Sequence, residues 1–120
     1  MIAGTFRRDH PRIPLILPGS EAPLEVEFTV DTGFAGDPAR PLDLLRQLDA
    51  VVIGSRDRLL AGGIMIRCAL YELVMEWADD ARSVEVLVLD GDPLVGTELL
   101  RDTLLQIEMV EGGEVVVEAL

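Results

Sequence analysis

Hydrophobic and polar residues alternate along much of the chain, and this period of two predicts β-strands. The alternation is clearest over residues 24–31, which read Leu24, Glu25, Val26, Glu27, Phe28, Thr29, Val30 and Asp31. One face of such a strand is buried and the other meets solvent. Residues 12–17 form a second apolar run that ends at Pro18-Gly19-Ser20, which predicts a partner strand and a turn. Pro14 indicates that this partner lies at a sheet edge.

The same pattern predicts further strands and two short helices. The additional strands are expected at residues 51–53, 56–60, 64–77, 83–89, 105–109 and 114–118. Gly62-Gly63 and Gly112-Gly113 mark turns between neighbouring strands. Residues 41–48 carry leucines at helical spacing after Pro41, and residues 97–101 form a helical turn. The pattern therefore predicts one all-β domain spanning residues 1–120 with two short helices.

Charge narrows the classes of partner. The 120 residues include 22 Asp and Glu against 10 Arg and no Lys, which gives a formal net charge of −12. Phosphate contacts need clustered basic residues, so we expect no nucleic acid as partner. The same charge opposes binding to an anionic membrane surface, and no apolar run approaches the ~20 residues of a membrane-spanning helix. We expect a cytoplasmic protein.

Cysteine and histidine each occur once. Cys68 has no partner for an internal disulfide, and one Cys with His10 is too few for an ordinary zinc site. We interpret Cys68 as a small buried hydrophobe and His10 as a surface residue. Asp79-Asp80 and Asp90-Gly91-Asp92 have too few ligands for a known calcium loop, so we interpret them as acidic turns. No metal and no cofactor is expected.

Asp31-Thr32-Gly33 is the sharpest chemical feature. The tripeptide follows the alternating strand and precedes a glycine-rich loop and the first helix. Taken alone it is also typical of an Asp that opens a turn, with Gly33 at positive φ. Residues 84–89 lead in a similar way to Pro93-Leu-Val-Gly96 and then to a helical turn. Two strand–glycine–helix units in one small domain indicate a pseudo-twofold construction, while the pattern common to all strands can also produce such an echo by chance.

These segments together resemble the retropepsin-like aspartic proteases, the single-domain relatives of the retroviral proteases. Residues 28–36 resemble the catalytic loop, and residues 54–77 resemble the flap hairpin with its continuation. Residues 93–96, with the helix over 97–101, resemble the hydrophobic-glycine motif. The similarity covers nearly the whole chain and is closest to a prokaryotic branch whose loop reads Asp-Thr-Gly-Phe. Phe34 stands where the retroviral enzymes carry a small residue.

The resemblance implies a retropepsin-like β-barrel and an aspartic endopeptidase that is active as a C2 homodimer. The catalytic residues would be Asp31, Thr32 and Gly33, with the second carboxylate supplied by Asp31 of another copy. Thr32 would brace the two loops, and Gly33 would let backbone approach the carboxylates. Contacts to a peptide or protein substrate would come from the catalytic loop, the flap and the glycine motif: Phe34, Ala35, Leu60, Ala61, Gly62, Gly63, Val95 and Gly96. Residues 114–120 would supply a free strand edge for the dimer.

Two other functions are compatible with the same residues. The first is a catalytically silent peptide-binding or regulatory module on the same fold, for instance an inhibitor of a partner protein. The second is a purely structural dimer with an acidic surface. Cleavage of a peptide library, with Asp31→Asn as control, separates the enzyme from both.

Overall fold

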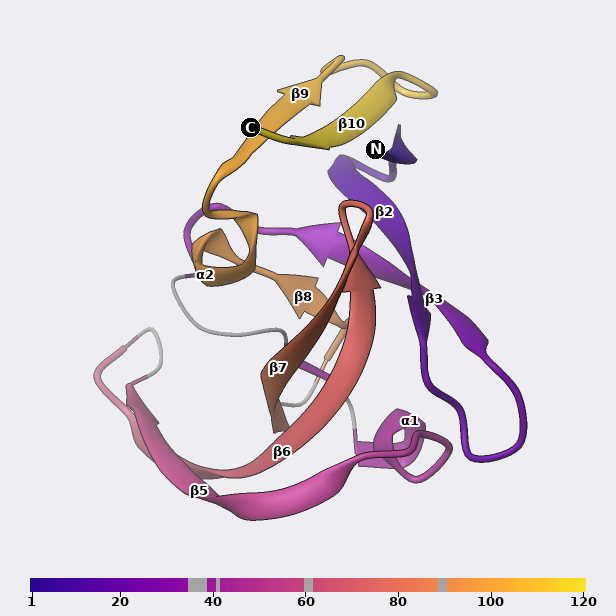
Figure 1. Cartoon of the computed structure of the whole chain (residues 1–120). Coiled ribbons are helices and arrows are strands. Elements are labelled where there is room, and N and C mark those ends of the chain that lie inside the picture. Colours follow the sequence, from indigo (N-terminus) through magenta and orange to yellow (C-terminus); the bar gives the residue numbers. More distant parts are fainter. Residues whose placement is uncertain (35–38, 41, 60–61, 89–90) are drawn as a thin grey trace.

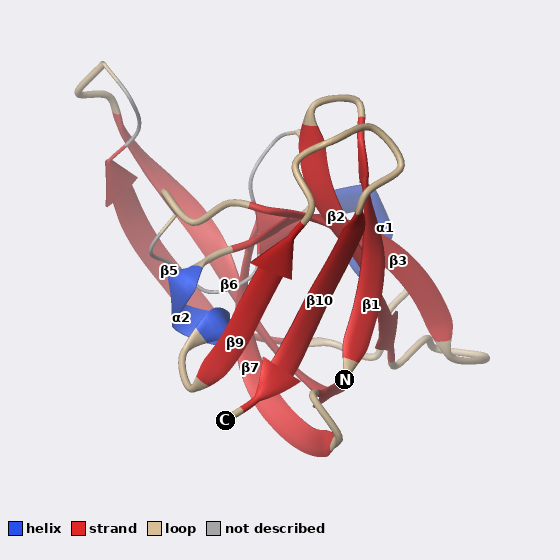
Figure 2. Cartoon of the chain, turned by 90° about the horizontal axis from the view of Figure 1, so that it is seen from above, coloured by secondary structure: helices blue, strands red, loops and turns tan. Residues whose placement is uncertain are grey.

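The computed structural model describes residues 1–34, 39–40, 42–59, 62–88 and 91–120 (Figure 1). Its strands are β1 (Ile2–Arg7), β2 (His10–Leu17), β3 (Leu24–Val30), β4 (Ala39–Arg40), β5 (Val51–Leu59), β6 (Met65–Trp77), β7 (Asp80–Val88), β8 (Leu94–Val95), β9 (Thr103–Ile107) and β10 (Glu114–Ala119). The helices are α1 (Leu42–Leu45) and α2 (Thr97–Leu100). The strands form one sheet in the order β5-β6-β7-β4-β8-β3-β2-β1-β10-β9, which curls into a half-barrel (Figure 2). The prediction of an all-β chain with two short helices is confirmed.

The β2–β3 hairpin forms as its alternation predicts. Val26, Phe28 and Val30 are buried in the main core, whereas Glu25 and Glu27 are exposed. The two strands pair antiparallel from Arg12–Thr29 to Leu17–Leu24. Burying one face of each strand fixes this register, because a slip of one residue would turn the apolar set to solvent.

The prediction that Pro14 marks an edge strand is wrong, because β2 lies between β3 and β1. The β1–β2 pairing, however, covers only Thr5–Arg7 and ends at Arg12. From residue 13 onward β2 is therefore paired with β3 alone among the described strands. A proline is tolerated where one side of the strand lacks a ladder.

The predicted free edge at residues 114–120 is also wrong. β10 lies between β1 and β9, and the side chains of Val115 and Val117 are 0% exposed. The strand that covers it, β1, was not predicted, because only two large apolar residues occur in it. Gly4 lets β1 cross close to β2, since a Cβ at this position would lie 1.9 Å from the carbonyl oxygen of Arg12. β1 thereby turns from β2 to pair with β10.

The long strand β6 changes its buried face near Tyr71. Leu73, Met75 and Trp77 point into the main core, whereas Cys68 and Leu70 form a second small cluster with Leu87 of β7. The buried positions thus change from even to odd numbers along one strand. The predicted burial of Cys68 is confirmed.

β5 is one strand where two segments, 51–53 and 56–60, were predicted, and a β-bulge interrupts its pairing with β6 between Val52 and Gly54. The predicted turn at Gly62-Gly63 is confirmed, with φ of 89° and 80°. The acidic turn predicted at Asp79-Asp80 is a tight connection through Ala78 and Asp79, both at positive φ. None of the described helices is long and apolar enough to cross a membrane.

Candidate active site

Asp31 is held where two distant segments of the chain meet. β3 and β8 pair in parallel, with Val30 opposite Val95. The Thr29 N–H donates to the carbonyl of Pro93 and the Asp31 N–H to the carbonyl of Val95, both at 2.9 Å. The glycine-containing segment 93–96 therefore lies beside the Asp-Thr-Gly loop. Main-chain bonds of this kind fix the position of the Asp31 backbone.

The carboxylate of Asp31 closes a tight turn. Its Oδ1 accepts the N–H of Gly33 at 2.9 Å, and the Asp31 carbonyl accepts the N–H of Phe34 at 3.1 Å. Gly33 is not at positive φ, so the interpretation of it as a left-handed turn residue is wrong. A Cβ at Gly33 would lie 3.3 Å from Asp31 Oδ1. Its smallness keeps the carboxylate close to the main chain.

Phe34 and Gly96 lock the two segments together. The Phe34 carbonyl accepts the Thr97 N–H at 2.8 Å. A Cβ on Gly96 would lie 2.1 Å from this carbonyl oxygen and 2.6 Å from Cδ1 of the Phe34 ring. Only glycine allows this approach. Gly96 is also the N-cap residue of α2, and its carbonyl accepts the Leu100 N–H at 3.2 Å.

A pocket of about 400 Å³ opens beside Asp31 and is lined by His10, Thr29, Val30, Asp31, Asp92 and Leu94. Asp31 is half-buried, and its Oδ2 receives no hydrogen bond from the part of the chain that the structure describes. The arrangement thus presents one carboxylate oxygen that the main chain holds and a second one that is available to a water or a proton. The volume of the pocket is within the range of small-ligand sites.

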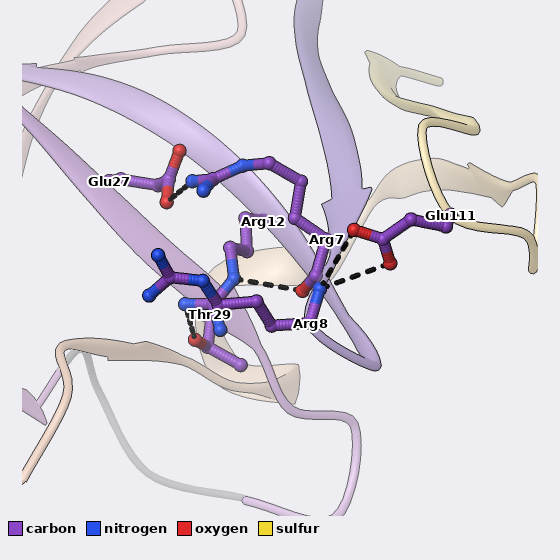
Figure 3. A network of polar contacts seen from close by, with 6 residues as sticks. All are labelled: Arg7, Arg8, Arg12, Glu27, Thr29 and Glu111. Carbon is purple, nitrogen blue, oxygen red and sulfur yellow. Dashed lines mark hydrogen bonds and ion pairs between the residues drawn. The ribbon is translucent and has the colours of Figure 1, made fainter.

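A polar network supports the pocket from the β1–β2 side (Figure 3). The half-buried Arg12 donates from Nη1 to Thr29 Oγ1 at 3.3 Å and from Nε to the Arg7 carbonyl at 3.1 Å. Thr29 is only 8% exposed, so the Arg12 guanidinium supplies the hydrogen bond that its buried hydroxyl needs. Arg7 also pairs with Glu27, and the Arg8 N–H donates to Glu111. The network thus connects the site to the loop between β9 and β10, which contains Glu111.

The predicted site residues divide into three groups. Asp31, Gly33, Phe34, Val95 and Gly96 come together at the β3–β8 junction, and the exposed Thr32 lies in the same loop. Gly62 and Gly63 form the turn of the β5–β6 hairpin, which projects from the sheet (Figures 1 and 2). A Cβ at either glycine would meet no atom of the described residues within 4 Å, so none of them covers this turn. Ala35, Leu60 and Ala61 lie outside the described residues.

Sequence reasoning missed five pocket residues: His10, Thr29, Val30, Asp92 and Leu94. His10 is exposed as predicted, but counting outward from the turn of the β2–β3 hairpin places it opposite Asp31, two residues beyond the Arg12–Thr29 pair. The register that this count requires comes from the structure, because the six residues between β2 and β3 do not specify it. Asp92 and Leu94 depend on the parallel β3–β8 pairing, for which the only signal was the echo of the two glycine-containing segments.

The described residues include no group of three or more His, Cys, Asp or Glu side chains arranged to hold a metal ion. Comparison with protein-family models, with curated proteins and with solved structures finds no match to this chain.

Proposed function

We propose that this chain is an aspartic endopeptidase that works as a homodimer. The observation that carries the proposal is the setting of Asp31. It follows the half-buried strand β3, one oxygen of its carboxylate is fixed by the Gly33 N–H, and a pocket adjoins it. The resemblance of residues 28–36 and 93–96 to the family's two loops adds support, because the described parts of these segments, residues 28–34 and 93–96, lie together in this fold.

In the proposed reaction a water molecule is activated between Asp31 and Asp31 of a second copy. One carboxylate, ionised, takes a proton from the water as its oxygen attacks the peptide carbonyl carbon. The other, protonated, donates a hydrogen bond to the carbonyl oxygen. The C–N bond then breaks as the leaving nitrogen receives a proton from the dyad, and no covalent intermediate with the protein forms. Two carboxylates ~3 Å apart cannot both be ionised, so the pair retains the proton that this chemistry needs.

The loop that carries Asp31 is suited to meet a second copy. Thr32 and Gly33 are exposed, while the backbone behind them is anchored on β8. A rigid, exposed loop can pack against its twofold mate without losing the carboxylate's position. Thr32 would then contact the other copy, as the resemblance implies. The projecting β5–β6 hairpin would cover an extended substrate.

Cleavage profiling of a diverse peptide library from acidic to neutral pH tests the proposal. We expect a bell-shaped rate profile with its optimum at about pH 4–6, because the dyad must hold one proton. Asp31→Asn should abolish cleavage while leaving the fold intact, since the amide oxygen of Asn can still accept the Gly33 N–H. Asp49→Asn, the same charge change at an exposed residue outside the pocket, is the matched control and should cleave normally. Cleavage that survives in pure Asp31→Asn protein refutes the assignment.

Sedimentation tests the dimer separately. Two chains of formal charge −12 repel each other, so the dimer should tighten as salt screens that repulsion. A chain that stays monomeric at high micromolar concentration in every salt condition has no second carboxylate and is not this enzyme. If it binds peptides in that state without cleaving them, the catalytically silent peptide-binding module is the correct function.

A further inference from the structure

The β5–β6 hairpin has an open outer edge. β5 is the terminal strand of the sheet and pairs with β6 on one side only among the described strands. It is nine residues long, and beyond the bulge its pairing runs from Gly54 to Leu59 without interruption. Figures 1 and 2 show the hairpin extending away from the rest of the sheet. An edge of this length offers main-chain donors and acceptors to another strand.

Exposed apolar side chains gather on the same hairpin. Six large ones are between 44% and 66% exposed: Val51, Val52, Ile53, Leu59, Ile64 and Met65. Single exposed hydrophobic residues need no explanation, but a group of them along one hairpin indicates an interaction surface. The surface therefore combines free backbone groups with apolar side chains.

The part of the hairpin beyond the bulge has a charge opposite to that of the rest of the chain. Residues 54–70 contain three Arg and one Asp, a net charge of +2, which leaves −14 on the other residues of a chain of −12. Asp57 pairs with Arg67 at 3.0 Å, and Arg56 pairs with Glu85 at 3.1 Å. Arg58 makes no ion pair with a described residue, and its buried Nε has no hydrogen-bond partner among them. A cationic donor in this state favours an incoming carboxylate.

We propose that the outer edge of β5 binds an extended acidic segment of another protein as an added strand. Arg56 and Arg58 are two residues apart and so lie on one face of β5. The segment that fits has carboxylates at alternate positions facing this side and apolar side chains on its other face, toward Leu59. Main-chain hydrogen bonds supply affinity, and the arginines select the charge.

A second copy of this chain matches the edge less well. Two β5 strands carry the same net positive charge, so their mutual pairing gains nothing from charge. The sheet's other terminal strand, β9, contains no charged residue between Thr103 and Ile107. The inference depends on the hairpin alone and not on the chemistry proposed for Asp31.

The test uses capped, fluorescent peptides as long as β5, in which Glu alternates with Thr, and their Gln and Lys counterparts. Binding to the full chain is measured by anisotropy, and the site is located from amide NMR shifts. We expect the Glu peptide to bind at least about tenfold more tightly than the Gln and Lys peptides, with shifts concentrated in β5. Arg58→Glu should weaken binding of the Glu peptide by a similar factor. Arg82→Glu, the same charge reversal at an exposed residue of β7, should leave the affinity for the Glu peptide unchanged.

Backbone pairing is tested with two Glu peptides that are N-methylated at complementary sets of alternate amides. An added strand directs only one set toward β5, so one peptide should bind and the other should not. Equal binding of the two overturns the added strand. Equal affinity for the Glu and Lys peptides, or an equal effect of Arg58→Glu and Arg82→Glu, overturns the charge selection. Asp31→Asn should bind the Glu peptide as the native chain does, so a failure here is distinct from a failure of the proposed catalysis.

Discussion

Gly96→Ala probes the contact that joins the two halves of the candidate site. The added Cβ would lie 2.1 Å from the Phe34 carbonyl oxygen, 2.9 Å from the Phe34 carbonyl carbon and 2.6 Å from the ring. Two of these atoms belong to the backbone, so rotation of a side chain cannot relieve the clash. The segments must separate. Their separation would break the Thr97–Phe34 bond of 2.8 Å and disturb the Asp31–Val95 bond.

The cost follows from two contributions. Inserting a methyl group into closely packed structure costs about 1–3 kcal/mol, and loss of one hydrogen bond adds about 0.5–1.5 kcal/mol. We expect the free energy of unfolding to fall by about 2–4 kcal/mol. For a chain of this size this lowers the melting temperature by roughly 10–20 °C.

Urea denaturation of the native chain and of Gly96→Ala measures this cost directly. The matched control is Gly33→Ala, in the neighbouring loop. Among the described residues its Cβ would meet only the Asp31 side chain, at 3.3 Å, and its φ is not positive, so we expect a loss below about 1 kcal/mol. If Gly96→Ala costs no more than Gly33→Ala, the close approach of the two segments does not exist in solution. The parallel β3–β8 junction would then be wrong.

Three further predictions address the core, the hairpin and pH. Val117→Ala in the interior strand β10 should cost about 2–3 kcal/mol by urea denaturation, because the side chain is fully buried; Val110→Ala, at an exposed site, should change stability by less than about 0.5 kcal/mol. Gly63 has a φ of 80°, and a Cβ there would meet no described atom within 4 Å. If the hairpin covers substrate, Gly63→Ala should slow peptide turnover by a larger factor than its modest loss of stability explains. Kinetics and thermal unfolding that show activity and stability falling in parallel would contradict that role. The hydrogen bond and charge of Asp57 raise the pKa of Arg67 above its ordinary value, so on the alkaline side the stabilisation does not change up to that ordinary value and is lost only as pH rises through the raised pKa. Arg67→Gln and the native chain should therefore have parallel stability curves between about pH 5 and 9, and curves that diverge in that window would contradict the assignment.

The fold was predictable where local pattern decides it. The alternation in β3, the apolar runs of β2 and β6 and the glycine turn at residues 62–63 each encode their structure within a few residues. The strand β1 was missed because it has only two large apolar residues, with Gly4 between them. The need for glycine there arises from the Arg12 backbone of a neighbouring strand. The prediction of a free edge at β10 was wrong because it also depended on β1: nothing in residues 114–120 indicates that β1 pairs with them.

The site was predictable in part. Asp31 and Gly96 stand out in the sequence because each follows or begins a recognisable element. Their contact depends on parallel pairing between residues 29–30 and 94–95, which joins positions more than sixty residues apart, and short-range patterns do not specify such pairs. The interpretation of Phe34 as a substrate contact remains a prediction, while the structure shows that its carbonyl holds Thr97 and that its ring lies against Gly96.

The two proposals place their demands on parts of the molecule with different local stability. The Asp31 backbone is held by hydrogen bonds to β8 behind a core of fully buried side chains. The β5 arm of the hairpin is held by its pairing with β6 and by ion pairs with exposed partners. Local opening costs the least free energy where few apolar contacts are lost. We therefore expect that β5 can separate from β6 without displacing Asp31. A segment bound along β5 would restrain that opening. Hydrogen exchange should therefore slow in β5 when the acidic segment binds and stay unchanged in β3, and an enzyme that uses the hairpin as a lid should then turn over more slowly.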